Sequence, residues 1–389
     1  MKKLIAAAAG LMLVGTMVGS AAAAVTFGGD ARVRWYYEEN GNGLDQKDEK
    51  FSSRVRVKVN ADAKGGAYAR ARIRMADSTW DGTRQTRNRG AGSNSYVDYA
   101  YIGVPMGPVT FEGGLMPVNL TKFTLWDARA DQFILKWAND MTNLEFWFQK
   151  NLEVESRPAD PTFNDLADDN DINTYFLKWD QKFAGDWMTT VGLAYRQDET
   201  PADVEGAQFT VHFSGPAGPV ALAGELAYVE SDLLGAGAST AGGAVTAADD
   251  AWGGYLQGGM NFGATSATIS GGFTQDGYLA DDDFGYIMIG GASSITPAVA
   301  SQIGLYGDWG WIAGDIGFKV SEQLSLRGVL AYADISDYGD LFEVSGSVKY
   351  AISDGASFTW DIGYLNNNAD ADVGDENPFG TALTFGISY

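Results

Sequence analysis

The chain has 389 residues, contains no cysteine and carries a formal net charge of −23 at pH 7. The acidic balance argues against nucleic-acid binding, which needs a basic surface. The lack of cysteine argues against a small secreted fold held by disulfides.

The first 24 residues form a predicted secretory signal peptide. Lys2 and Lys3 precede an apolar run, and the small-x-small pattern of Ala22 and Ala24 predicts cleavage after Ala24. No later apolar run approaches the ~20 residues of a membrane helix, and no domain boundary is visible. Residues 25–389 are therefore expected to form one exported domain.

Residues 26–38 and 51–76 alternate polar and apolar side chains with a period of two, which predicts strands whose two faces meet different media. With a turn at Gly65, Arg56 is expected opposite Arg74, and Lys58 opposite Arg72. Like charges placed directly across a strand pair destabilise it, so this face must be wet and rich in counter-charge. The expected basic lumen wall comprises Arg32, Arg34, Arg54, Arg56, Lys58, Arg70, Arg72 and Arg74.

Alternating segments of about ten residues, the length of a strand that crosses a bilayer, recur along the rest of the chain. Short Gly-containing connections alternate with long polar ones, as in barrels with short periplasmic turns and long outer loops. Residues 284–310 are interpreted as mostly loop, and a count of 16 strands is the alternative to 18. The predicted strands span 26–38, 51–63, 67–76, 95–104, 109–116, 132–138, 142–151, 172–182, 187–197, 206–214, 220–230, 252–262, 266–275, 305–320, 324–334, 341–352, 357–366 and 378–389.

The fold prediction is an all-β, transmembrane, antiparallel up-and-down β-barrel. The alternative is a soluble sandwich with a solvated arginine face, although such faces usually mix both signs of charge. Aromatic residues near strand ends are interpreted as interfacial girdles rather than as core. The girdle candidates are Trp35, Tyr37, Tyr99, Tyr101, Trp137, Trp179, Trp187, Tyr195, Tyr228, Trp252, Trp360 and Tyr364.

Two stretches carry a resemblance: YVDYAYIGV followed by a turn and VTFEGG, and the C-terminal TALTFGISY. They resemble segments of Gram-negative outer-membrane porins, the trimeric diffusion channels. The resemblance implies that residues 117–131 fold into the lumen as a constriction loop, and that Phe385, Ile387 and Tyr389 form the signal for the outer-membrane assembly machinery. It also implies a homotrimer surrounded by outer-membrane lipid and lipopolysaccharide.

The basic residues are unevenly placed. Residues 32–89 hold 14 of the 25 Lys and Arg left after Lys2 and Lys3 are removed from 27, whereas residues 200–389 hold three. Acidic groups on distant strands are expected to face the basic wall, and such charge arrangements set ion selectivity. The constriction loop and acidic lumen are predicted to include Asp98, Glu112, Lys122, Asp127, Arg129, Asp131, Glu225, Asp315, Glu343 and Asp361.

No enzyme, cofactor or structural metal is expected. His212, the only histidine, lacks a surrounding nucleophile signature. The aspartate clusters at 168–171, 281–283 and 370–376 offer oxygen ligands for weak calcium binding but do not match a calcium-binding hand loop.

The leading functional hypothesis is a water-filled channel for passive diffusion of ions and small hydrophilic solutes. The alternative is a channel selective for anions such as phosphate, sulfate or carboxylates. A surface-binding or envelope-anchoring barrel, suggested by the acidic outer loops, is a third hypothesis.

Overall fold

The computed structural model describes residues 24–41, 47–80, 95–152, 171–199, 205–230, 250–291, 293–336, 338–369 and 376–389. The predicted signal peptide before Ala24 lies outside this part of the chain. Among the described residues, no helix is both long and apolar enough to cross a membrane.

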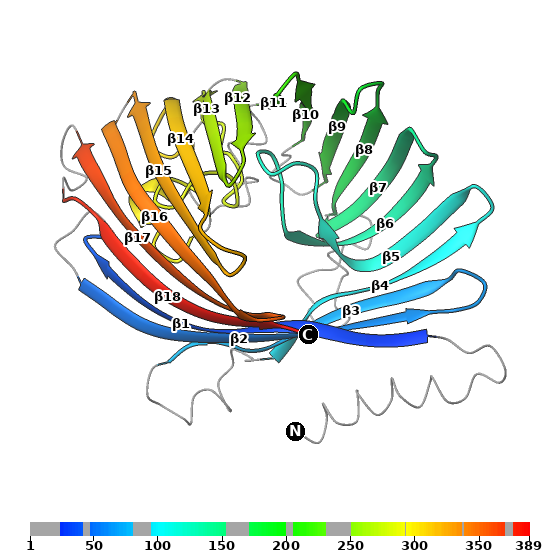
Figure 1. Ribbon diagram of the computed structural model, residues 1–389. Helices are drawn as coiled ribbons and strands as arrows, with labels where there is room; N and C mark the ends of the chain where they lie inside the picture. The colour runs from blue at the N-terminus through cyan, green and yellow to red at the C-terminus, as the bar shows by residue number, and fades with distance from the viewer. Residues whose placement is uncertain are drawn as a thin grey trace, which may run out of the picture.

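The strands form one closed, antiparallel, 18-stranded sheet, as the alternation predicts, and Figure 1 shows them arranged around a central space. The barrel closes because the first strand in the chain pairs with both the second strand and the last strand. Ala31 lies opposite Val55 of the second strand and opposite Ile387 of the last. The strands are β1 Ala24–Glu39, β2 Lys47–Asp62, β3 Tyr68–Thr79, β4 Ser95–Met106, β5 Val109–Val118, β6 Ala128–Ala138, β7 Thr142–Leu152, β8 Ile172–Lys182, β9 Met188–Asp198, β10 Gly206–Ala217, β11 Val220–Val229, β12 Ala251–Phe262, β13 Thr265–Gln275, β14 Trp309–Lys319, β15 Leu324–Ile335, β16 Gly339–Ser353, β17 Ala356–Ala369 and β18 Phe379–Ser388.

The outer face of the barrel is apolar and exposed. Phe27, Ile269 and Leu330 expose 61%, 60% and 55% of their surface. Large apolar side chains exposed in this number are typical of a sheet surrounded by lipid.

A bulge in β4 changes the expected face of two tyrosines. Arg72 pairs with Tyr99 and Ile73 with Val97, so Asp98 is the extra residue between them. Because an extra residue shifts the alternation by one, Tyr99 lies on the inner face under the Arg72 guanidinium, 4.9 Å from it. Tyr101 packs against a cluster of buried residues that includes Met116 and Ile134. The prediction that these tyrosines belong to an outer girdle is therefore wrong.

Two connections fold into the barrel. The β5–β6 loop is residues 119–127, shorter than the predicted 117–131 because β5 and β6 extend further than the alternation suggested. The β13–β14 loop is residues 276–308, and residues 284–290 belong to it, as predicted. β14 begins at Trp309 rather than near residue 305. Figure 1 shows part of this loop, in yellow, behind β13–β16.

The β13–β14 loop forms an apolar core with the inner face of one half of the barrel. Its residues Ile287, Met288, Ile289 and Ile303 are buried in one cluster with inner-face residues of β14 to β18. These inner-face residues are Trp309, Trp311, Ala313, Val329, Ala331, Ala333, Ile335, Leu341, Leu365 and Ala382. This half of the lumen is thus filled by protein.

Candidate functional site: a basic wall between two inward loops

The hairpin of β2 and β3, which carries most of the basic wall, has the predicted register. Arg56 lies opposite Arg74, and Lys58 opposite Arg72, while Arg32 lies opposite Arg54. Arg34 continues the wall on β1, where its Nε donates to Thr384 Oγ1 at 3.3 Å.

The nearest counter-charges come from neighbouring strands and not from the opposite wall. Asp30 on β1 accepts from Arg56 Nε at 2.9 Å and lies 3.8 Å from Arg54. Asp62 pairs with Arg70 at 2.6 Å. Cross-strand side chains are within reach of one another, whereas the far wall is separated by the lumen. These local pairs explain how the barrel tolerates consecutive like charges.

The densest charge cluster surrounds Asp98, the bulge residue of β4. Its carboxylate is buried and pairs with Arg72, with Arg74 at 3.1 Å and with Arg129 at 3.1 Å. Arg129 comes from β6, at the base of the β5–β6 loop, and also pairs with Asp127 at 2.8 Å. The bulge therefore joins the basic wall to the inward loop.

The β5–β6 loop crosses to the far wall and is held there by apolar and polar contacts. Phe123 is fully buried among Tyr255, Tyr278, Phe284 and Trp311. A side chain at Gly192 of β9 would collide with Leu120, because an added Cβ would lie 2.8 Å from its methyl carbons. Glycine at this position makes room for the loop.

Glu225 anchors the polar side of the same loop. It is buried, and its Oε1 accepts the hydroxyls of Thr121, Thr124 and Thr210, the last at 2.8 Å. Glu343 is likewise buried, and its two oxygens accept the backbone N–H groups of Ile287 at 3.2 Å and Ile289 at 2.9 Å. The expectation that these two acids face the lumen is wrong: both are covered by the loops they hold.

Asp281 connects the two inward loops. Its backbone N–H donates to the Phe123 carbonyl at 2.9 Å, and its carboxylate accepts the Trp126 N–H at 2.7 Å. Burial raises the pKa of Asp281 to about 6, against the opposing effect of the N–H groups of Asp283 and Trp126.

The other predicted charges are dispersed. Glu112 pairs with Lys136 at 2.5 Å, and Asp315 pairs with Arg327 at 2.6 Å. Lys122 is exposed on the β5–β6 loop, and Asp361 is half-buried on β17. Asp131 is exposed on the same face of β6 as Phe133 and Leu135, so it lies on the outer face. The prediction that Asp131 belongs to the constriction is wrong, because β6 begins three residues before it and sets its direction.

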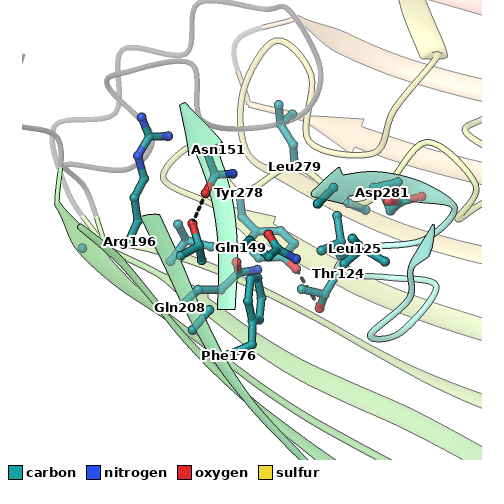
Figure 2. A pocket seen from close by; sticks show the side chains of 18 of the residues that line it. Thr124, Leu125, Gln149, Asn151, Phe176, Arg196, Gln208, Tyr278, Leu279 and Asp281 are labelled. Carbon is teal, nitrogen blue, oxygen red and sulfur yellow. Dashed lines mark hydrogen bonds between the residues drawn. The ribbon is translucent and has the colours of Figure 1, made fainter. Parts of the chain in front are cut away.

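A cavity of about 230 Å³ lies between the inner wall and both loops. Its polar lining includes Arg129, Arg196, Gln149, Asn151 and Gln208, and its apolar lining includes Leu125, Phe176 and Tyr278. Figure 2 shows Arg196 and Asp281 at opposite sides of it. Arg129 belongs both to this cavity and to the Asp98 cluster, so the two basic regions are continuous.

The remaining predicted sites have simple placements. Phe385, Ile387 and Tyr389 are exposed on the outer face, and Tyr389 exchanges two backbone hydrogen bonds with Gly29. His212 lies opposite Glu225. The carboxylates of Asp281, Asp282 and Asp283 lie within 4.8 Å of one another, but both oxygens of Asp281 already accept backbone N–H groups. Residues 168–170 and 370–375 lie outside the described residues.

Sequence reasoning missed Gly192, Phe123 and its aromatic cage, and the cavity. A glycine in an otherwise regular strand was the available signal for Gly192, since such glycines often mark close approach of another segment.

The sequence matches no family model and no curated protein. The fold is similar to that of solved outer-membrane channels. Against OpdO from Pseudomonas aeruginosa the TM-score is 0.62, with 11% identity over 94% of this chain and 97% of that chain. Against a BenF-like porin from Pseudomonas fluorescens Pf-5 it is 0.59, with 12% identity over 94% and 98%. Against OpdK from Pseudomonas aeruginosa, solved with vanillate, it is 0.59, with 12% identity over 93% and 98%.

Proposed function

We propose that this protein is an outer-membrane channel through which small solutes bearing a carboxylate diffuse passively. One observation carries the proposal: a continuous basic route leads from the cavity residues Arg196 and Arg129 to the wall of β1–β3. Charged rows of this kind set the selectivity of a pore.

The position of the two inward loops inside the barrel supports the same route. The two inward loops cover the apolar half of the inner face and bury Glu225 and Glu343. On the other half of the barrel Arg54 and Arg56 stay partly exposed, so we expect a solute to pass basic side chains. Arg guanidinium groups hold planar carboxylates by two parallel hydrogen bonds.

The similar channels support the solute class. OpdK was solved with vanillate, and another similar barrel is described as BenF-like. A cavity lined by Arg129, Arg196, Phe176 and Tyr278 suits a small aromatic carboxylate. This reading is narrower than general diffusion of hydrophilic solutes, which stays the second candidate.

Planar-bilayer recording tests the proposal. The purified barrel should conduct, its reversal potential in a KCl gradient should show anion preference, and benzoate should transiently block the current. Replacing Arg56 and Lys58 with glutamine should reduce anion preference. The matched control is Arg327→Gln, since Arg327 lies on another wall and pairs with Asp315. Anion preference unaltered by the double replacement would remove the basic wall from the mechanism.

Several further expectations belong to the same proposal: export with cleavage after Ala24, insertion guided by the C-terminal strand, contact with lipopolysaccharide, and assembly as a homotrimer. Mass spectrometry of the mature chain and cross-linking in native membranes test the first and the last. Deleting residues 235–250 tests the surface-binding alternative, which predicts lost partner binding with conductance retained.

A further inference from the structure

Two acids meet the three arginines of the Asp98 cluster in different ways. Asp98 is 4% exposed and pairs with Arg72, Arg74 and Arg129. Asp127, on the β5–β6 loop, leaves 47% of its side chain exposed while it pairs with Arg129 at 2.8 Å. Asp98 therefore serves as a structural counter-ion, whereas Asp127 lies at the edge of the open lumen.

The second contact of Asp127 is incomplete. Its Oδ1 lies 3.9 Å from Arg72 Nη2, beyond hydrogen-bond distance. Arg72 is buried, and its Nη2 has no hydrogen-bond partner among the described residues. A buried donor without a partner is costly, so this nitrogen favours any carboxylate that reaches it.

We propose that Asp127 is a built-in competitor that occupies the place of a solute carboxylate between Arg72 and Arg129. A passing carboxylate displaces the Asp127 side chain from Arg129 and completes the contact with Arg72. Asp127 then returns and releases the solute. This inference rests on the proposed function and adds the residue that tunes it.

The charge balance explains why a channel benefits from such a competitor. Three arginines facing Asp98 alone would hold a carboxylate strongly, and conduction requires binding weak enough for the solute to leave. Asp127 neutralises one further charge when no solute is present. The solute carboxylate replaces that of Asp127 at Arg72 and Arg129, and Asp127 replaces it again when the solute leaves. One carboxylate besides Asp98 is therefore always present to balance the three arginines.

The backbone allows a clean test of this role. Asp127 has a left-handed conformation, with φ of 47°, and its N–H donates to Asn119 Oδ1 at 2.9 Å. Asparagine also adopts this conformation readily. Asp127→Asn should therefore keep the loop in place while removing the competing charge.

The experiment compares benzoate block of single-channel current in the wild type, Asp127→Asn and Asp186→Asn, with uncharged benzamide and chloride as reference solutes. Asp186 is the matched control, because it also has a left-handed backbone, with φ of 62°, but lies exposed in the β8–β9 turn. In Asp127→Asn the half-blocking benzoate concentration should fall by roughly threefold to fivefold, and each block should last longer. Asp186→Asn and benzamide should show no such change.

The outcomes separate this inference from the proposed function. If benzoate does not block the wild type, the carboxylate channel itself is rejected. If benzoate blocks the wild type and Asp127→Asn equally, the channel stands and the competitor role is overturned. If chloride permeability rises by the same factor as benzoate affinity, Asp127 acts only through its field, which also overturns the proposal.

Discussion

The ring of Phe123 stacks on that of Tyr278, with ring centroids 5.3 Å apart and planes 17° from parallel. The two residues belong to the two inward loops, so this contact joins the β5–β6 loop to the β13–β14 loop. Asp281 reinforces the junction with two backbone contacts. The width of the lumen thus depends on two inward loops that pack against each other, rather than on a single loop.

Phe123→Ala should release the tip of the β5–β6 loop. Replacing a buried phenylalanine by alanine costs about 3–5 kcal/mol, here at the attachment of the loop, and the current through a single channel should become larger and noisier. Phe318→Ala is the control, because Phe318 is 46% exposed on the outer face. An unchanged conductance in Phe123→Ala would show that the loop does not narrow the route.

Gly192→Val should also release the β5–β6 loop and increase the current, here through a steric clash. The added side chain would meet Leu120 and Thr210, each less than 3 Å from the new Cβ, and push the loop from the wall. Gly314→Val is the matched control, since a Cβ at Gly314 meets no atom within 4 Å. Single-channel conductance should rise in the first variant alone.

Asp281 should make the junction between the loops pH-dependent. Its pKa of about 6 lies above the usual value of 3.8, so the attached loops bind the proton more tightly than released loops do. The stabilisation is fully present below pH 4 and is lost as the pH rises through 6, a change of about 3 kcal/mol.

Selective ¹⁵N-tryptophan labelling can follow this titration at the amide of Trp126. Its NMR signal should shift with a midpoint near pH 6 in the wild type and remain constant in Asp281→Asn. Hydrogen exchange in the two loops, corrected for the intrinsic rate, should be slower at pH 4 than at pH 7. A midpoint near pH 4 would contradict the effect of burial.

Glu343→Gln should loosen the β13–β14 loop. The amide group retains one acceptor oxygen, so either Ile287 N–H or Ile289 N–H loses its partner in a buried site, at a cost of about 1–3 kcal/mol. Hydrogen exchange at residues 284–291 should accelerate. Glu322→Gln, in the exposed β14–β15 turn, should leave exchange unchanged; equal rates in both variants would assign the loop's stability to its apolar contacts alone.

Local patterns predicted the wall of the barrel well. A strand between lipid and water must alternate every second residue, so the antiparallel order and the pairing of Arg56 with Arg74 follow from neighbours in the chain. The pattern failed at Tyr99 and Tyr101, because the β4 bulge shifts the alternation by one residue. It also failed at Asp131, where the start of β6 was placed too late.

The sequence by itself determined the barrel and the location of the basic wall, because these depend on the faces that each strand presents to lipid and water. The structure decided between 16 and 18 strands in favour of 18. Only the tertiary structure decided which part of the lumen is filled. Glu343 meets Ile287 and Ile289 more than 50 positions away in the chain, and Thr121 meets Glu225 across 104 positions. Such contacts arise when loops pack on inner faces, and no local period records them. That packing also brings Arg129 and Asp127 to the arginines of the wall.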